Sequence, residues 1–167
     1  MGADGGRDPE GLEVFCRREY PRLVRLLAVY CGDGTAAEDL AQETLARVWE
    51  HWERVGGMDR PDLWAKRVAL NLANSWHRRR RFQRRAVPAA VAAGDETARV
   101  DGDAEFARLV RGLSARQRAV VVLRYYEDLS VSDTAGLLGV REGTVRALSS
   151  QALTRLRAEG VVEEVGR

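Results

Sequence analysis

The sequence contains few of the residues that build disulfide frameworks or metal centres. Its 167 residues include two cysteines, Cys16 and Cys31, and two histidines, His51 and His77. Two cysteines cannot form a disulfide framework, and this ligand inventory argues against a structural zinc site. Both cysteines lie within helical patterns, where a free cysteine usually packs as a small hydrophobe. We therefore expect no metal and no other cofactor.

Long apolar stretches are also absent. The longest candidates, residues 119–123 and the proline-interrupted 86–93, fall well short of the roughly 18 to 20 residues that cross a bilayer. Residues 1–11 are rich in Gly and Asp and lack the apolar region of a secretory signal. We expect a folded cytoplasmic protein with no membrane partner.

Positive and negative charges nearly balance in the whole chain, but they are unevenly distributed along the sequence. The 27 basic and 25 acidic residues leave a net charge of +2, and every basic residue except Lys66 is Arg. Residues 77–85 read HRRRRFQRR, with no acid among them. Such a run is often only a solvated helix end. The neighbouring Trp76 and Phe82 favour nucleic-acid binding, because aromatic faces beside Arg suit bases and phosphates.

Helical periodicity covers most of the chain and predicts an all-α fold. The first helix, at about 12–30, buries one face and ends at Gly32. Thr35 with Glu38 predicts a capping box at the start of the second helix. A third helix restarts near Pro61 and runs into the arginine cluster. The predicted buried stripes of these helices are Leu23, Leu26, Leu27 and Tyr30; Leu45, Val48, Trp49 and Trp52; and Trp64, Val68, Leu72 and Trp76.

A change of composition at residues 86–104 indicates a flexible linker between two small helical domains. Capping pairs Ser114/Gln117 and Ser130/Asp133 predict helices at about 115–125 and 131–138. The predicted organisation is a disordered extension at 1–11, a first domain at 12–85, the linker at 86–104, a second domain at 105–160 and a tail at 161–167.

The second domain contains the pattern of a helix-turn-helix. The helix at 131–138 is followed by a short turn containing Gly139 and by a longer helix from about Glu142. An αα-hairpin that only packs is the alternative. If the motif binds DNA, the first turn of its second helix enters the major groove. The candidate DNA-binding residues there are Arg141, Glu142, Thr144 and Arg146.

An acidic segment opens the second helix of the first domain. Carboxylates are favoured at a helix N-terminus by the helix dipole, which explains part of this segment. The remaining polar surface lies opposite the predicted apolar stripe and suits a basic protein partner. The candidate partner-binding residues are Glu38, Asp39, Gln42 and Glu43.

Three segments, in this order, resemble the extracytoplasmic-function group of alternative sigma factors within the sigma-70 family. AEDLAQETLARVWEHW (37–52) resembles the part that docks on the clamp coiled coil of core RNA polymerase. WAKRVALNLANSWHRRRR (64–81) is similar to the helix that recognises and melts the minus-ten element, and residues 113–157 resemble the region that reads the minus-thirty-five element. The resemblance covers about residues 12–157, nearly the whole chain.

The resemblance implies a subunit that binds core polymerase, at its clamp coiled coil and its flap, and promoter DNA. It places an extruded base at the loop 54–61, which contains Arg60, and at Asn71. An Asn can form paired hydrogen bonds with a base edge. It implies that Arg78, Arg79, Arg80 and Arg81 hold the DNA backbone near Trp76. An anti-sigma protein that clamps both domains is a further partner known in this family.

The last helix departs from the family pattern. Ala147, Leu148 and Gln151 stand where the family commonly has Ser and Arg residues, which predicts weaker minus-thirty-five binding. Two other readings stay open: a stand-alone helix-turn-helix regulator, and a protein-binding module whose DNA contacts have decayed. An enzyme is disfavoured, because we find no clustered catalytic acid pair, phosphate-cradling Gly loop or metal-ligand constellation in the sequence.

Overall fold

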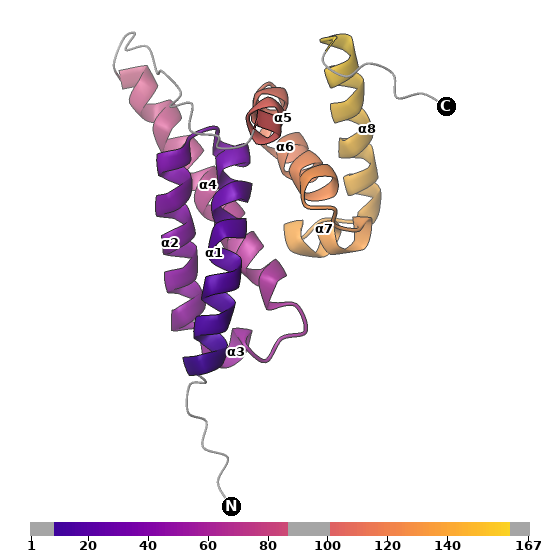
Figure 1. Cartoon of the computed structure of the whole chain (residues 1–167). Helices are drawn as coiled ribbons and strands as arrows, with labels where there is room; N and C mark the ends of the chain where they lie inside the picture. The colour runs from indigo at the N-terminus through magenta and orange to yellow at the C-terminus, as the bar shows by residue number, and fades with distance from the viewer. Residues whose placement is uncertain (1–8, 87–100, 161–167) are drawn as a thin grey trace, which may run out of the picture.

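The computed structural model describes residues 9–86 and 101–160, which form helices joined by short turns (Figure 1). The first unit contains α1 (Pro9–Cys31), α2 (Gly34–Glu50), the single turn α3 (Trp52–Val55) and α4 (Pro61–Ala86). The second contains α5 (Asp101–Arg111), α6 (Ala115–Val121), a π-helical turn η1 (Val122–Tyr126), α7 (Val131–Leu138) and α8 (Glu142–Ala158). The all-α prediction is confirmed.

Local sequence signals explain most helix ends. Ser114 accepts a hydrogen bond from the Gln117 N–H while the Gln117 side chain accepts one from the Ser114 N–H, which completes the predicted capping box. The Ser130 hydroxyl accepts a hydrogen bond from the Asp133 N–H at the start of α7. Gly32 and Gly139 follow α1 and α7 with φ of 67° and 66°, a conformation that glycine adopts without strain.

Several boundary predictions were wrong. Asp33, not Thr35, caps α2, because its carboxylate accepts the Ala36 N–H at 2.9 Å. Helix α1 begins at Pro9, inside the predicted extension, and α5 begins at Asp101, inside the predicted linker. The helix expected at 115–125 changes into the π turn at Val122. The predicted disorder of 1–8, the predicted flexibility of 87–100 and the tail at 161–167 lie outside the described residues.

A continuous apolar core joins the two units. Buried residues of α1, Leu23, Leu26, Leu27 and Tyr30, belong to the same cluster as Val110 of α5, Leu123 of η1 and Ala152 of α8. Figure 1 shows α5 and α6 alongside the end of α1, with α8 at the outer edge of the second unit. The two units are therefore packed against each other, and α4 is in contact with α7 as well.

Two smaller clusters stabilise the ends of the molecule. Phe15 and Trp52 pack with ring centroids 5.3 Å apart, beside Val48, where α1, α2 and α4 converge. In the second unit, Ala135 of α7 and Val145 of α8 fill the angle of the helix-turn-helix. Leu138, the last residue of α7, packs against the same cluster.

Candidate polymerase and nucleic-acid surfaces

The acidic segment of α2 forms an exposed surface. Glu38, Asp39, Gln42 and Glu43 are all exposed, while Leu40 and Ala41 between them are buried. Glu43 forms an ion pair with Arg47 one turn later, at 2.9 Å. This pair is open to solvent and contributes little to stability. The surface thus lies on one face of α2 and is accessible to a partner.

Trp49 was wrongly predicted to be buried. Two other members of its stripe, Val48 and Trp52, are 0% and 8% exposed and Leu45 is partly buried, whereas Trp49 is 53% exposed. Trp49 lies seven residues after Gln42, on the same side of α2. Periodicity missed it because an apolar residue at a stripe position is ordinarily assigned to the core. The acidic surface therefore ends in an exposed indole, and large aromatic side chains frequently anchor protein interfaces.

Helix α4 carries exposed polar side chains near its middle and in its C-terminal half. Asn71 is exposed on α4, one turn before Asn74, whose carbonyl oxygen accepts the Tyr30 hydroxyl at 2.7 Å. Arg78 and Arg79 are exposed, and Arg78 donates to the Ser75 hydroxyl at 3.0 Å. Asn71 and the arginines therefore lie on one helix, with the amide nearer to its N-terminal end.

Arg60 lies in the loop before α4. Its guanidinium donates through Nε and Nη2 to both carboxylate oxygens of Asp62, each at 3.0 Å. It also lies 3.6 Å from the carboxylate of Asp133 on α7. In this arrangement Arg60 is shared between the start of α4 and the second unit.

The region around Trp76 and Arg80 is more enclosed. Trp76 is half-buried, and the Arg80 guanidinium carbon lies 4.9 Å from its ring centroid, a cation–π contact. Arg80 also pairs with Asp33 at 2.9 Å. Partial burial acts to raise the pKa of Asp33, but hydrogen bonds from Ala36 and Arg80 outweigh it and hold that pKa below its usual value. Arg80 thereby ties the C-terminal part of α4 to the cap of α2.

The helix-turn-helix exposes the first turn of α8. Arg141 and Glu142 are exposed, Thr144 is half-buried, and Arg146 is exposed and pairs with Glu142 at 2.8 Å. Among the residues expected to weaken DNA binding, Ala147 and Gln151 are exposed, but Leu148 packs against the cluster that contains Val145. Leu148 is therefore a packing residue of the motif.

The predicted site residues do not converge on one cleft. The acidic surface is on α2, the asparagine and arginines are on α4, and the helix-turn-helix residues are on α8, at the opposite edge of the molecule (Figure 1). Such a distribution suits several separate contacts with large partners. Within the described ranges, no group of His, Cys, Asp and Glu is arranged to hold a metal ion, and no helix is both long and apolar enough for a bilayer crossing.

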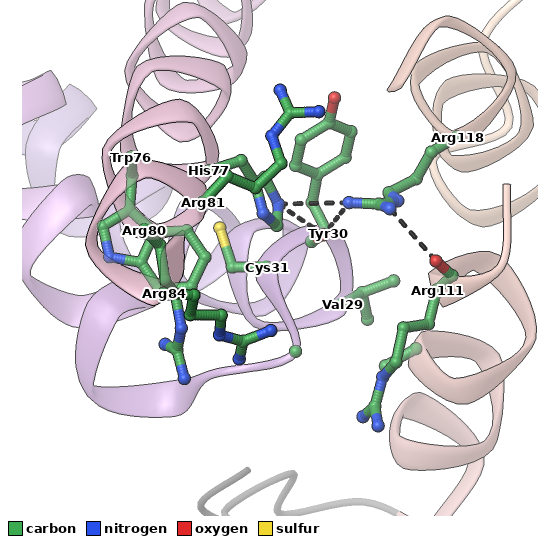
Figure 2. A pocket seen from close by; sticks show the side chains of 12 residues that line it. Val29, Tyr30, Cys31, Trp76, His77, Arg80, Arg81, Arg84, Arg111 and Arg118 are labelled. Carbon is green, nitrogen blue, oxygen red and sulfur yellow. Dashed lines mark hydrogen bonds between the residues drawn. The ribbon is translucent and has the colours of Figure 1, made fainter. Parts of the chain in front are cut away.

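The structure brings together residues that sequence reasoning did not connect. Arg118 of α6 donates to the backbone carbonyls of Val110 and Leu113 at 3.2 and 3.3 Å, and its Nη1 lies 3.1 Å from His77 Nε2 (Figure 2). Because a guanidinium can only donate, His77 accepts through Nε2. Burial, followed by the charge of Arg118, lowers the pKa of His77 to about 4. No helical pattern marks Arg118, because its partners lie outside α6, on α4, on α5 and in the turn before α6.

Cys31 lies beside these groups and is not a reactive thiol. Burial raises its pKa to about 12, so the sulfur stays protonated near neutral pH and is a poor nucleophile. Cys16 on α1 is partly buried, and burial raises its pKa as well. The expectation that both cysteines pack as small apolar groups fits these environments.

Two family models match the chain. The model described as Sigma-70 region 2 matches residues 15–83, and the model described as Sigma-70, region 4 matches residues 109–158. Among curated proteins, the RNA polymerase sigma-E factor of Streptomyces coelicolor is 31% identical, over 92% of this chain and 88% of its own length. The ECF RNA polymerase sigma factor SigL of Mycobacterium tuberculosis is 35% identical, over 81% of this chain and 79% of its own length.

Solved structures show the same fold at lower identity. The sigma factor RpoE of Bartonella quintana, solved in complex with the anti-sigma factor NepR, superposes with a TM-score of 0.70 at 22% identity, over 91% of this chain and 98% of its own. CnrH, solved with the cytosolic domain of CnrY, gives a TM-score of 0.68 at 21% identity, over 92% and 90% of the two chains.

Proposed function

Because the chain belongs to the extracytoplasmic-function group of the sigma-70 family, we propose that its described surfaces divide the work of an RNA polymerase sigma factor. The observation that carries the proposal is the physical separation of an acidic surface on α2, a basic surface on α4 and a helix-turn-helix. The domains are proposed to be residues 12–85 and 105–160, the first for core polymerase and the minus-ten element and the second for the minus-thirty-five element. The proposed site of action is the cytoplasm.

The acidic surface of α2 is the proposed contact with core polymerase. Four polar side chains point outward from a helix whose opposite side is buried, and Trp49 adds an exposed aromatic ring. A charged patch of this kind steers a basic partner and fixes its orientation, while the indole supplies buried apolar area on contact. The proposed contact residues are Glu38, Asp39, Gln42, Glu43 and Trp49.

Helix α4 and the loop before it are the proposed minus-ten surface. Asn71 is exposed and offers both a donor and an acceptor for a base edge. Arg60 lies in the loop directly before the same helix, and this loop is the proposed pocket for the extruded nucleobase. The arginines Arg78 to Arg81 supply planar donors for the phosphate backbone, and Trp76 supports Arg80.

The helix-turn-helix is the proposed minus-thirty-five reader. Arg141, Glu142 and Arg146 extend from the exposed first turn and a half of α8, with Thr144 partly covered. A recognition helix places these positions in the major groove.

RNA synthesis belongs to the polymerase, so the proposal gives this chain no catalytic role. In the same family, the expected regulatory partner is an anti-sigma protein.

A pair of variants with opposite defects tests this division of work. Asp39→Lys with Glu43→Lys reverses charge on the α2 surface and is expected to abolish binding to core polymerase, because both side chains are exposed and the fold does not need them. Asn71→Ala is expected to keep core binding and to lose promoter opening, because only the base contact is removed.

Binding to core is measured by co-elution, and promoter opening by the reactivity of unpaired thymines. Glu105→Lys, an exposed charge reversal on α5, is the matched control and should behave as the unaltered chain does. Core binding that survives the double reversal in a folded protein contradicts the α2 assignment. Normal opening by the Asn71 variant contradicts the base-pocket assignment.

A further inference from the structure

A basic cavity lies between the two units. It has a volume of about 380 Å³ and is lined by the end of α1, the C-terminal half of α4, and α5 and α6 (Figure 2). Five arginines line it: Arg80, Arg81, Arg84, Arg111 and Arg118. None of the described residues that line it is acidic. The cavity therefore concentrates positive charge contributed by both units.

The five arginines differ in how many of their guanidinium N–H groups already have partners within the protein. The Arg118 guanidinium is held by backbone carbonyls and His77, which fixes its position but does not neutralise its charge. Arg80 is paired with Asp33. Within residues 9–86 and 101–160, no carboxylate pairs with the side chains of Arg81, Arg84 or Arg111. Three guanidinium groups are therefore open to a ligand.

Their geometry selects the chemistry of that ligand. Guanidinium groups form paired, charge-assisted hydrogen bonds with phosphate oxygens. Arg84 on α4 and Arg111 on α5 stand on facing walls of the cavity, while Arg81 also lines it and directs its guanidinium toward the Tyr30 ring (Figure 2). A ligand that satisfies both walls needs negatively charged oxygens at more than one end. The neutral state of His77, whose pKa is lowered first by burial and then by Arg118, Arg81 and Arg80, is consistent with this positive field.

We propose that this cavity is a binding site for a small polyphosphate anion, which Arg84 contacts from the first unit and Arg111 contacts from the second. The volume lies at the lower end of the range for small-ligand sites. A nucleic-acid strand is the less favoured occupant, because the cavity lies between the two units, with Arg111 and Arg118 forming the wall opposite α4. Both an inorganic polyphosphate and the phosphate chain of a nucleotide carry the required chemistry.

The site has a consequence for the proposed function. Arg80 and Arg81 line the cavity and are also among the proposed contacts to promoter DNA. A polyphosphate bound there would place negative charge beside these side chains and hold the two units together. This consequence rests on the proposed function, whereas binding of the anion itself does not. The test below uses neither polymerase nor promoter, so failure of either idea is distinguishable from failure of the other.

Calorimetric titration of the full chain with sodium tripolyphosphate at low salt tests the site. We expect one anion per chain, and a dissociation constant about tenfold or more higher for the variant Arg84→Ala with Arg111→Ala, because charge-assisted contacts from both walls are lost. Arg116→Ala is the matched control: this arginine is exposed on α6 and does not line the cavity. It should bind as tightly as the unaltered chain, and melting temperatures without ligand establish that each variant is folded.

Further titrations identify the source of the phosphate. Tighter binding of a nucleoside triphosphate than of tripolyphosphate assigns the site to nucleotides, and equal or weaker binding assigns it to the phosphate chain alone; both support the proposal. No measurable binding, several anions per chain, or equal losses in the Arg116 control would overturn it. It is also overturned if single-stranded DNA binding falls by the same factor as tripolyphosphate binding in the double variant, since the arginines would then belong to a nucleic-acid surface.

Discussion

At the scale of single residues, His77 shows how the packing of the two units controls a titration. Its ring stands between Tyr30 and Trp76, at centroid distances of 5.8 and 4.8 Å, and it accepts a hydrogen bond from Arg118. Burial and the nearby charges of Arg118, Arg81 and Arg80 lower its pKa to about 4, compared with about 6.5 in an unfolded chain. The folded protein therefore keeps His77 neutral where the unfolded chain would protonate it.

This shift predicts a loss of stability on acidification. Between about pH 6.5 and pH 4 the unfolded chain binds a proton at His77 that the folded chain does not, so the free energy of unfolding falls as the pH falls. His77→Gln removes the titrating group and keeps an acceptor for Arg118. We expect it to reduce the difference in stability between about pH 7 and pH 4.5 by on the order of 1 kcal/mol, since solvent partly screens this half-buried group.

Urea unfolding of both proteins at the two pH values measures this difference. Titration of the carboxylates is common to both proteins and cancels in the comparison. An unchanged pH dependence in the His77→Gln variant would show that the imidazole is not held neutral at the junction of the units.

At the scale of the elements, the helices that carry the proposed surfaces follow from short local signals. The capping box at Ser114 and the left-handed Gly139 could be predicted because each depends on residues within a few positions of one another. The cap of α2 was misassigned to Thr35, because Asp33 and Thr35 are both good caps and the sequence does not show which one the chain turns at. Trp49 was misassigned for another reason, because its exposure depends on how much of the α2 surface the other helices cover.

The turn of the helix-turn-helix offers a matched pair of glycine substitutions. Gly139 has a φ of 66°, so Gly139→Ala forces an L side chain into a left-handed conformation and is expected to destabilise the protein by about 1 kcal/mol or more. Gly136 lies inside α7, and a Cβ there meets nothing within 4 Å. Gly136→Ala is expected to stabilise the protein by about 0.5 to 1 kcal/mol, because alanine is the better helix former.

Thermal and urea unfolding of the two variants provide the comparison. The two glycine-to-alanine substitutions, three residues apart, are expected to change the free energy of unfolding in opposite directions. If both variants destabilise the protein equally, the positive φ of Gly139 does not explain the end of α7, and the turn has another geometry.

At the scale of the whole molecule, the packing of the two units is the feature that the sequence could not reveal. Tyr30 of α1 donates to Asn74 and lies 3.4 Å from the carbonyl of Ala115, 85 residues along the chain. Lys66 of α4 pairs with Glu127, just after η1, at 2.7 Å, with side chains 10% and 14% exposed. Periodicity identified each helix, but such contacts depend on which faces meet, and no local pattern encodes that choice.

The Lys66–Glu127 pair predicts the energetic link between the units. Lys66→Met leaves Glu127 largely buried without its partner and is expected to lower the free energy of unfolding by about 3 kcal/mol. Lys66→Met combined with Glu127→Leu removes both charges and is expected to recover most of that loss. A double-mutant cycle from urea unfolding measures the coupling. A loss below about 0.5 kcal/mol for Lys66→Met would mean that the units do not pack through this pair in solution.

The most direct test of the central claim is association of the full chain with bacterial core RNA polymerase by co-elution, followed by transcription of fragmented genomic DNA by the same mixture. The account predicts co-elution and initiation at discrete sites, which would also reveal the promoter sequence. A folded chain that elutes apart from core polymerase and directs no initiation would contradict the account and favour a stand-alone helix-turn-helix regulator.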